Sequence, residues 1–331
     1  MVKPKVYVTR IIPQAGLEMV REFCEAEIWE GETPPPRQVL VEKVKGVNGL
    51  LSLLTDSIDA EVMDAAGAQL KVIANYAVGY DNVDVEAATA RGIIVTNTPG
   101  VLTDTTADFA FTLLMAAARR VVEGMDYVRA GKWHTWGPTL LLGQDIHHAT
   151  LGLIGMGRIG RGMARRAQGF DMHILYHDPY CSPEEVEALG ARSVELDTLL
   201  AESDFVSVHV PLTPETHLML SAEQFKMMKP SAILINSARG PIVDPDALYA
   251  ALKNGEIAYA ALDVTEPEPL PADHKLLTLP NIIVCPHIAS ASVATRTKMA
   301  TMAAENLIAG LRGEMPPNPV NPEVLGNLPD L

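Results

Sequence analysis

Side chains that suit acid–base and anion chemistry follow apolar runs in the second half of the chain. Arg239, the acidic segment 266–268 (EPE) and His287 each come just after a predicted strand. Because ligands bind beyond the carboxyl ends of parallel strands, we expect these groups to meet at one sheet edge. A guanidinium matches a carboxylate with two hydrogen bonds, and a histidine beside a carboxylate suits a general acid. This set predicts the reduction of a 2-oxo acid by hydride transfer.

A glycine-rich segment, 155–160 (GMGRIG), points to a dinucleotide cofactor. The G-x-G-x-x-G pattern follows a predicted strand and opens a predicted helix. In that setting the first glycine permits a tight turn, the second lets the backbone approach a pyrophosphate, and the third lets the helix pack on the strand. The helix start presents N–H groups to the phosphate charge. We predict cofactor contacts from Gly155, Gly157, Arg158, Ile159 and Gly160.

Asp178 sets the expected type of dinucleotide. It ends the next predicted strand, at roughly the 20-residue spacing that dinucleotide-binding folds use. Its carboxylate can accept hydrogen bonds from the ribose hydroxyls and would repel a 2′-phosphate, and residues 179–183 contain no Arg or Lys. The sequence therefore favours NAD over NADP. The alternative, a purely structural strand–helix turn, stays open.

Short apolar strands alternate with helical segments along the chain. This alternation predicts an α/β protein with two doubly wound parallel-sheet domains and a cleft between them. We expect a Rossmann-type NAD-binding domain at 100–287, and a flavodoxin-like, discontinuous substrate-binding domain at 1–99 and 288–331. Long helices are predicted at 104–122 and 292–311. Strands are predicted at 5–10, 47–54, 70–77, 93–98, 150–154, 173–177, 205–210, 232–236, 258–264 and 282–285.

Composition excludes several other classes of protein. The chain has 26 Lys and Arg against 41 Asp and Glu, a net charge of −15, which argues against nucleic-acid binding. Its three cysteines are widely spaced and form no CxxC, so we expect no metal site and no disulfide framework. Reduced thiols and the lack of an N-terminal apolar segment predict a cytoplasmic protein. No apolar run is long enough for a membrane span.

Three segments resemble signatures of the D-isomer-specific 2-hydroxyacid dehydrogenases. They are 228–244 (MKPSAILINSARGPIVD), 263–269 (DVTEPEP) and 286–290 (PHIAS). The resemblance runs over nearly the whole chain. It implies Arg239 as the substrate binder and His287 as the catalytic acid and base.

The resemblance also assigns roles that the spacing alone leaves open. In the family the catalytic acid is the fifth residue after the motif's aspartate, which selects Glu268 over Glu266 as the partner of His287. The aspartate itself, Asp263, is implied to hold the nicotinamide carboxamide. Further residues implied or expected at the cofactor are His209, Thr216 and Ala238.

The segment 78–84 (VGYDNVD) resembles the family's substrate loop, in which backbone N–H groups at Val78 and Gly79 bind the substrate carboxylate. Within the family, the segment 133–143 (WHTWGPTLLLG) is most similar to glyoxylate and hydroxypyruvate reductases. That branch implies a homodimer and a Trp136 that reaches the partner's active site. Packing within a dimer is an equally open role for Trp136.

Two alternative functions remain at this point. A close branch of the family oxidises phosphite, but it carries a lysine where this chain has Val78, which argues against a doubly charged oxyanion. Some relatives act mainly as NAD-sensing corepressors or scaffolds. The presence of Arg239, Glu268 and His287 together favours catalytic turnover.

Overall fold

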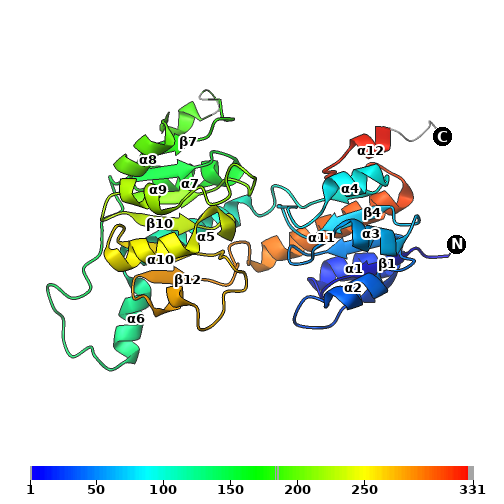
Figure 1. Cartoon of the computed structure of the whole chain (residues 1–331), viewed down its shortest axis with the longest axis horizontal. Coiled ribbons are helices and arrows are strands. Elements are labelled where there is room, and N and C mark those ends of the chain that lie inside the picture. Colours follow the sequence, from blue (N-terminus) through cyan, green and yellow to red (C-terminus); the bar gives the residue numbers. More distant parts are fainter. Residues whose placement is uncertain (1, 183, 185, 327–331) are drawn as a thin grey trace. The chain divides into compact units, whose positions relative to one another are not determined.

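The computed structural model describes residues 2–182, 184 and 186–326 and divides into two compact units (Figure 1). Unit 1 takes the chain up to Leu102 and again from Ser292, and unit 2 spans Thr103–Ala291. The chain therefore enters unit 1 twice. The sequence placed these boundaries at 99/100 and 287/288.

Unit 1 is built on a five-stranded, all-parallel sheet in the order β2-β1-β3-β4-β5. This is the order of the doubly wound flavodoxin-like folds. The strands are β1 (Lys5–Val8), β2 (Glu25–Ile28), β3 (Gly49–Ser52), β4 (Val72–Asn75) and β5 (Ile94–Thr96). The helices are α1 (Gln14–Phe23), α2 (Arg37–Lys43), α3 (Ala60–Ala66), α4 (Val85–Ala90), α11 (Val293–Arg312) and α12 (Glu323–Gly326).

The core of unit 1 lies on both faces of this sheet, because successive side chains of a strand point to opposite faces. In β1, Val6 and Val8 pack into one hydrophobic cluster, whereas Tyr7 packs into the other. The helix α11 covers the first face and meets α1 at very short range. A Cβ on Gly16 of α1 would lie only 2.6 Å from the Ala300 carbonyl oxygen, so only glycine allows this helix pair to approach.

Unit 2 is built on a seven-stranded, all-parallel sheet in the order β12-β11-β10-β9-β6-β7-β8. Read in the opposite direction, the six strands from β8 to β11 have the Rossmann order, and β12 is one added strand at the edge. The strands are β6 (Thr150–Ile154), β7 (His173–His177), β8 (Ala191–Ser193), β9 (Phe205–Val208), β10 (Ile233–Asn236), β11 (Tyr259–Leu262) and β12 (Ile282–Val284). The helices are α5 (Thr103–Ala118), α6 (Val121–Arg129), α7 (Arg158–Gln168), α8 (Leu196–Glu202), α9 (Ala222–Met227) and α10 (Pro245–Asn254), with 3₁₀ turns η2 (Glu187–Leu189), η3 (Gly240–Ile242) and η4 (Lys275–Thr278).

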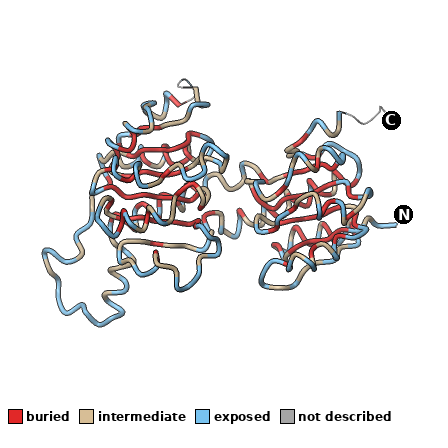
Figure 2. The backbone as a smooth tube through the Cα atoms, viewed as in Figure 1, coloured by how far each residue is buried: buried red, intermediate tan, exposed pale blue. Residues whose placement is uncertain are grey.

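The central strands of unit 2 are buried on both sides, as Figure 2 shows. In β10, Ile233 and Ile235 enter one hydrophobic cluster and Leu234 enters the other. Burial on two faces explains why these strands are continuous apolar runs in the sequence. All ten predicted strands are present and begin within two residues of the predicted positions. The more polar strands β2 and β8 were not predicted.

The prediction of one helix over 104–122 is wrong. The structure ends α5 at Ala118 and begins a second helix, α6, at Val121. The Ala118 carbonyl accepts the N–H of Gln144 instead of continuing the helix, and Arg120 takes a left-handed conformation with φ of 52°. Its guanidinium pairs with both oxygens of Glu123, at 2.7 and 3.0 Å. Contacts distant in the sequence therefore break the helix.

The segment after α5 is the most exposed part of unit 2. It consists of α6 and the loop that follows it, which we call the arm (residues 119–149; Figure 1). The helix α6 has no buried residue. Large apolar side chains are nevertheless exposed on it and beside it: Met115, Val121, Met125, Val128, Trp133, Trp136, Leu140 and Leu142.

The apolar stretch 109–118 of α5, by contrast, lies mostly in the core of unit 2. Across the described residues, none of the helices combines the length and the hydropathy that a bilayer crossing needs.

Candidate active site

Unit 2 gathers most of the predicted site residues at the carboxyl edge of its sheet. All seven strands are parallel, so the loops that follow them leave from the same edge. The main predicted residues come from the loops after six of these strands, and the loop after β11 carries two of them. The order is Gly155 after β6, Asp178 after β7, His209 after β9, Arg239 after β10, Asp263 and Glu268 after β11, and His287 after β12.

The histidine and the predicted carboxylate form a direct pair. The Nδ1 atom of His287 lies 2.6 Å from Oε1 of Glu268. Burial alone would raise the pKa of Glu268, but the hydrogen bond and charge of His287, the Thr265 N–H and the Arg239 charge outweigh it, so this pKa lies below its usual range. Glu268 is therefore a carboxylate at neutral pH, and it orients the imidazole so that Nε2 is left for another partner.

The turn that carries His287 is built around Asp263. The side chain of Asp263 is 1% exposed, and its two oxygens accept the N–H groups of Ile288 at 2.8 Å and Ala289 at 2.7 Å. Its carbonyl accepts the N–H of His287 at 2.9 Å. These bonds hold His287 in a left-handed conformation, φ 53°, which a non-glycine residue adopts only when its surroundings enforce it. Burial raises the pKa of Asp263.

Arg239 sits in a loop that is also braced by a buried side chain. Asn236, the last residue of β10, donates from Nδ2 to the Arg239 carbonyl at 2.9 Å and accepts the Ala238 N–H at 3.0 Å. Sequence reasoning missed Asn236. The available signal was a polar residue at the end of an otherwise apolar strand.

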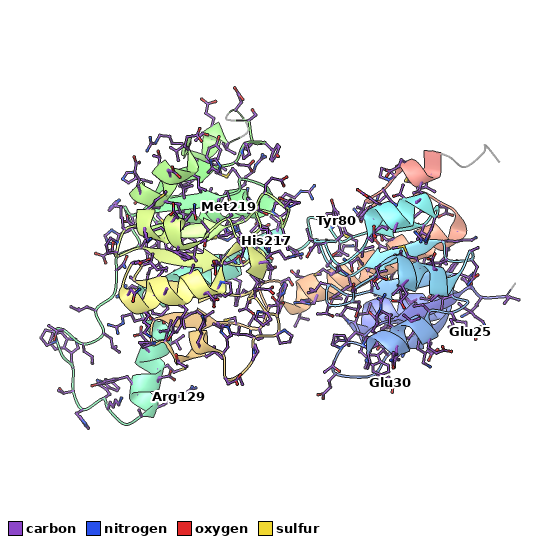
Figure 3. The ribbon with its side chains drawn as sticks, in the orientation of Figure 1. Glu25, Glu30, Tyr80, Arg129, His217 and Met219 are labelled. Carbon is purple, nitrogen blue, oxygen red and sulfur yellow. The ribbon has the colours of Figure 1, made fainter. Side chains whose placement is uncertain are left out.

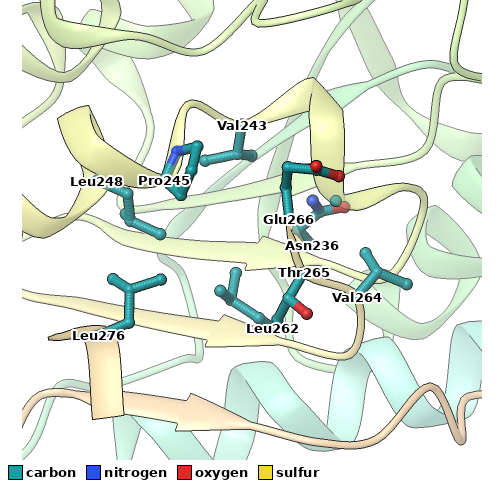
Figure 4. Close-up of a pocket in the computed structure, with 10 residues that line it drawn as sticks. Asn236, Val243, Pro245, Leu248, Leu262, Val264, Thr265, Glu266 and Leu276 are labelled. Atoms are coloured by element: carbon teal, nitrogen blue, oxygen red, sulfur yellow. The ribbon is translucent and has the colours of Figure 1, made fainter. Parts of the chain in front are cut away.

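Glu266 is the other acidic candidate on the same loop. It borders a small cavity of about 10 Å³, together with Asn236, Gly240 and Thr265 (Figure 4). That volume suits a single water molecule. A Cβ on Gly240 would lie 1.9 Å from the Thr265 carbonyl oxygen, so the Arg239 loop packs tightly on the loop that carries both glutamates. The carboxylate that contacts His287 in this structure is that of Glu268.

The three glycines of the 155–160 segment face different surroundings. Gly155 has φ of +96°, and a Cβ there would lie 2.8 Å from the His209 backbone. A Cβ on Gly160 would lie 2.2 Å from the Gly155 carbonyl oxygen. Nothing lies within 4 Å of a Cβ on Gly157, where α7 begins. Open space at a helix start, where the first N–H groups have no partner within the helix, fits a pyrophosphate.

Asp178 is tied to the same turn. Its Oδ2 accepts the N–H of Met156 at 2.8 Å, and its Oδ1 accepts the N–H of Tyr180 at 2.9 Å. The carboxylate thus lies beside the glycine turn and keeps further lone pairs for hydroxyl donors.

His209 and Thr216 shape the loop after β9. Nε2 of His209 lies 2.8 Å from Ser207 Oγ, and burial lowers the pKa of this histidine to about 4, so its ring is neutral. Thr216 Oγ1 donates to the Pro211 carbonyl and accepts the Thr213 N–H, which closes the loop on itself.

The other predicted site residues belong elsewhere. Val78 and Gly79 lie in unit 1, in the loop after β4, and are half-buried. Trp136 is in the arm and is 79% exposed. Among the described residues, no group of three or more His, Cys, Asp or Glu side chains is arranged to hold a metal ion.

The Rossmann strand order, the glycine turn and the histidine–carboxylate pair define a nicotinamide-dependent dehydrogenase. Residues 111–289 match the family model described as "D-isomer specific 2-hydroxyacid dehydrogenase, NAD binding domain". The chain belongs to the D-isomer specific 2-hydroxyacid dehydrogenase family, as its motifs indicated.

Similar proteins cover the chain almost completely. It is 58% identical to a glyoxylate reductase of Korarchaeum cryptofilum, over 98% of this chain and 97% of the relative. A solved structure from Thermus thermophilus is 51% identical, with a TM-score of 0.90, over 96% of this chain and 99% of that one. An NADPH-dependent glyoxylate/hydroxypyruvate reductase from Sinorhizobium meliloti is 36% identical, with a TM-score of 0.85, over 97% and 98% of the two chains.

Proposed function

We propose that the protein reduces glyoxylate and hydroxypyruvate to the corresponding 2-hydroxy acids, with NADH as the hydride donor. The observation that carries this proposal is the His287–Glu268 pair at the cofactor edge of unit 2, at 2.6 Å. The high identity to glyoxylate reductases supports the choice of substrate.

In the proposed reaction the nicotinamide, when bound, would supply the hydride that the carbonyl carbon accepts. The carbonyl oxygen gains negative charge as this happens, and His287 delivers a proton to it. The proton comes from Nε2, because Nδ1 is engaged by Glu268. Glu268 stays ionised and stabilises the charged imidazole before the proton leaves. In the reverse direction the neutral His287 takes the proton from the hydroxyl group.

Arg239 is proposed to bind the substrate carboxylate through its planar guanidinium. Asn236 and Gly240 hold its loop, so the side chain starts from a defined backbone position. In unit 1, the N–H groups of Val78 and Gly79 are proposed to bind the carboxylate as well. Val78 gives this loop no cation for a doubly charged oxyanion such as phosphite.

NAD is proposed over NADP because of Asp178. Its carboxylate lies beside the glycine turn and would repel a 2′-phosphate. Asp263 is proposed to accept from the nicotinamide carboxamide in addition to its two backbone bonds. The remaining proposed cofactor contacts are Gly155, Gly157, Arg158, Ile159, Gly160, His209, Thr216 and Ala238.

A homodimer is proposed on the basis of the arm. Its exposed apolar side chains form the kind of surface that a monomer rarely leaves in water. Trp136 is proposed either to reach the partner's substrate or to pack within the dimer. Light scattering on the wild type and on a Trp133→Ser, Trp136→Ser double variant tests the dimer. If the double variant stays dimeric, a raised KM favours contact of Trp136 with the partner's substrate, and an unchanged KM favours packing alone.

The function is tested by following absorbance at 340 nm with glyoxylate and hydroxypyruvate against NADH and NADPH. Consumption of NADH supports the proposal. The same protein with phosphite and NAD⁺ tests the phosphite alternative. Tight NADH binding without turnover on any of these substrates would favour a sensor over an enzyme.

A further inference from the structure

Three consecutive backbone carbonyls after β4 are each held by a donor from elsewhere in unit 1. The N–H of Thr98 donates to the Ala77 carbonyl at 2.8 Å. Asn97 Nδ2 donates to the Val78 carbonyl at 2.7 Å, and Asn75 Nδ2 donates to the Gly79 carbonyl at 3.0 Å. The orientation of three successive peptide planes is thereby fixed.

Fixing these carbonyls also fixes three N–H groups. In a trans peptide the C=O and the following N–H point in opposite directions, so each of the N–H groups of Val78, Gly79 and Tyr80 faces away from the donor that holds the preceding carbonyl. Within the described part of the chain, no acceptor takes any of these three N–H groups. We call residues 78–80 the amide cradle; Tyr80 is labelled in Figure 3. Adjacent unpaired N–H groups are a known kind of anion site.

Asn75 is held rigidly behind the cradle. It is fully buried at the end of β4, and its second Nδ2 hydrogen goes to Asn82 Oδ1 at 3.0 Å. Its Oδ1 accepts from Ser52 Oγ at 3.1 Å. Every donor of this amide is therefore in use, and any replacement loses the bond to Gly79.

Asn97 is fixed through its own backbone. It follows β5, and its carbonyl accepts from Asn306 Nδ2 of α11 at 2.9 Å, while its N–H donates to the Asn318 carbonyl at 3.3 Å. The backbone of Asn97 is thus anchored by the long helix α11, while its side chain is bonded to Val78. It cannot follow the loop if the loop moves.

We infer that Asn75 and Asn97 are positioning residues for substrate binding, and that the Tyr80 N–H is a third carboxylate donor beside those of Val78 and Gly79. This inference rests on the proposed function, in which the cradle takes the carboxylate of a 2-oxo acid. Donors that are already oriented need no reorganisation when the anion arrives, so they add affinity. They do not touch the carbonyl that is reduced. Loss of either asparagine should therefore raise KM and leave kcat nearly unchanged.

The main test is Asn97→Asp, which keeps the shape of the side chain but replaces the donor by an acceptor that repels the Val78 carbonyl. We expect the KM for glyoxylate to rise roughly tenfold or more, the scale of one hydrogen bond to a charged group. We expect kcat within about threefold and the Kd for NADH within about twofold of the wild type. An unchanged KM in the folded variant overturns the inference. Should Asn97→Asp fail to fold, Asn97→Ser removes the donor without adding charge.

Asn321→Asp is the matched control. Asn321 is also a buried amide of unit 1, and it accepts the Val95 N–H and donates to the Ile93 carbonyl and Thr89. It makes no bond to residues 77–80. We expect Asn321→Asp to lower the melting temperature without a tenfold rise in KM. An equal rise in KM for both variants would mean general loosening of unit 1 and would overturn the inference.

Titration with oxalate in the presence of NADH separates this inference from the proposed function. Oxalate presents a carboxylate but accepts no hydride. We expect the wild type to bind oxalate and Asn97→Asp to bind it at least tenfold more weakly. This result supports carboxylate binding by the cradle, whether or not glyoxylate is a substrate. If the wild type reduces glyoxylate and the variant has unchanged oxalate Kd and KM, the function stands and the inference fails.

Discussion

The two units present their functional groups in opposite ways. At the edge of unit 2 the groups are side chains, Arg239, Glu268 and His287, carried on loops after three different strands. At the edge of unit 1 the groups are backbone N–H groups of residues 78–80, and side chains only hold the loop from behind. A side-chain group can be removed by one substitution, whereas a backbone N–H is lost only on substitution by proline, which also constrains the loop.

Both units nevertheless brace their loops with the same device. Asn236 ends β10 and donates to the Arg239 carbonyl, and Asn75 ends β4 and donates to the Gly79 carbonyl. In each case an amide at the end of a buried strand fixes the loop that the strand delivers. The difference lies in what these two strands deliver: the cationic side chain of Arg239 after β10, and unpaired backbone amides after β4. Loss of the proton donor in unit 2 should therefore lower kcat, whereas loss of the groups that position the carboxylate donors in unit 1 should raise KM.

The largest expected effect comes from His287→Gln. The variant keeps a polar side chain but supplies no proton, so we expect kcat for glyoxylate reduction to fall at least about a hundredfold, the contribution of a general acid. Steady-state kinetics at saturating NADH measure this. His173→Gln is the control, since His173 is exposed at the amino end of β7. Wild-type kcat in the His287 variant would remove this residue from the mechanism.

Arg239→Lys should have the next largest effect. A lysine keeps the charge but cannot form two parallel hydrogen bonds to a carboxylate. We expect kcat/KM to fall roughly ten- to hundredfold, the range of a hydrogen bond to a charged group. Unlike the asparagine variants of unit 1, this change also displaces a charge that lowers the pKa of Glu268. A KM equal to that of the wild type would show that the carboxylate is bound elsewhere.

The same contrast explains what the sequence could predict. The central strands are apolar runs because both of their faces are buried, so they are visible without a structure. The strands β2 (EAEI) and β8 (ARS) are partly exposed and polar, and were therefore missed. The helix break near Arg120 depends on Gln144, which is too distant in sequence for a local pattern to show.

Site prediction follows a similar division. Arg239 and His287 are proposed to act through their side chains, so their types and their places after strands predict chemistry. The choice of Glu268 over Glu266 came from the family resemblance. Asn236, Asn75 and Asn97 act on carbonyl groups, and the sequence does not show which carbonyl lies within reach. That information exists only once the strands are paired and the loops are folded.

Acid should act in opposite directions on one buried group in each unit. In unit 2, burial lowers the pKa of His209 to about 4 from an ordinary 6.5, so its contribution is complete above pH 6.5 and is lost as the pH falls towards 4. In unit 1, burial raises the pKa of Asp56, so protonation favours the folded state there. Between pH 7.5 and 5, we expect the wild type to lose about 2 kcal/mol of unfolding free energy that His209→Gln does not lose. Urea unfolding at both pH values measures this, and equal losses would contradict it.

Asp178 combines the two kinds of group that the comparison separates, and its expected effect is the smallest. It is a side chain of unit 2, but its carboxylate is held by two backbone N–H groups. Asp178→Ala removes the acceptor for the ribose hydroxyls and the charge that repels a 2′-phosphate. We expect the ratio of kcat/KM for NADH over NADPH to fall about tenfold, the size of one hydrogen bond to a charged group. Asp178→Asn keeps an acceptor for the Met156 N–H but loses the charge. An equal shift in both variants assigns selectivity to the charge, a shift in the alanine variant alone assigns it to the bracing of the glycine turn, and no shift in either rejects the ribose role.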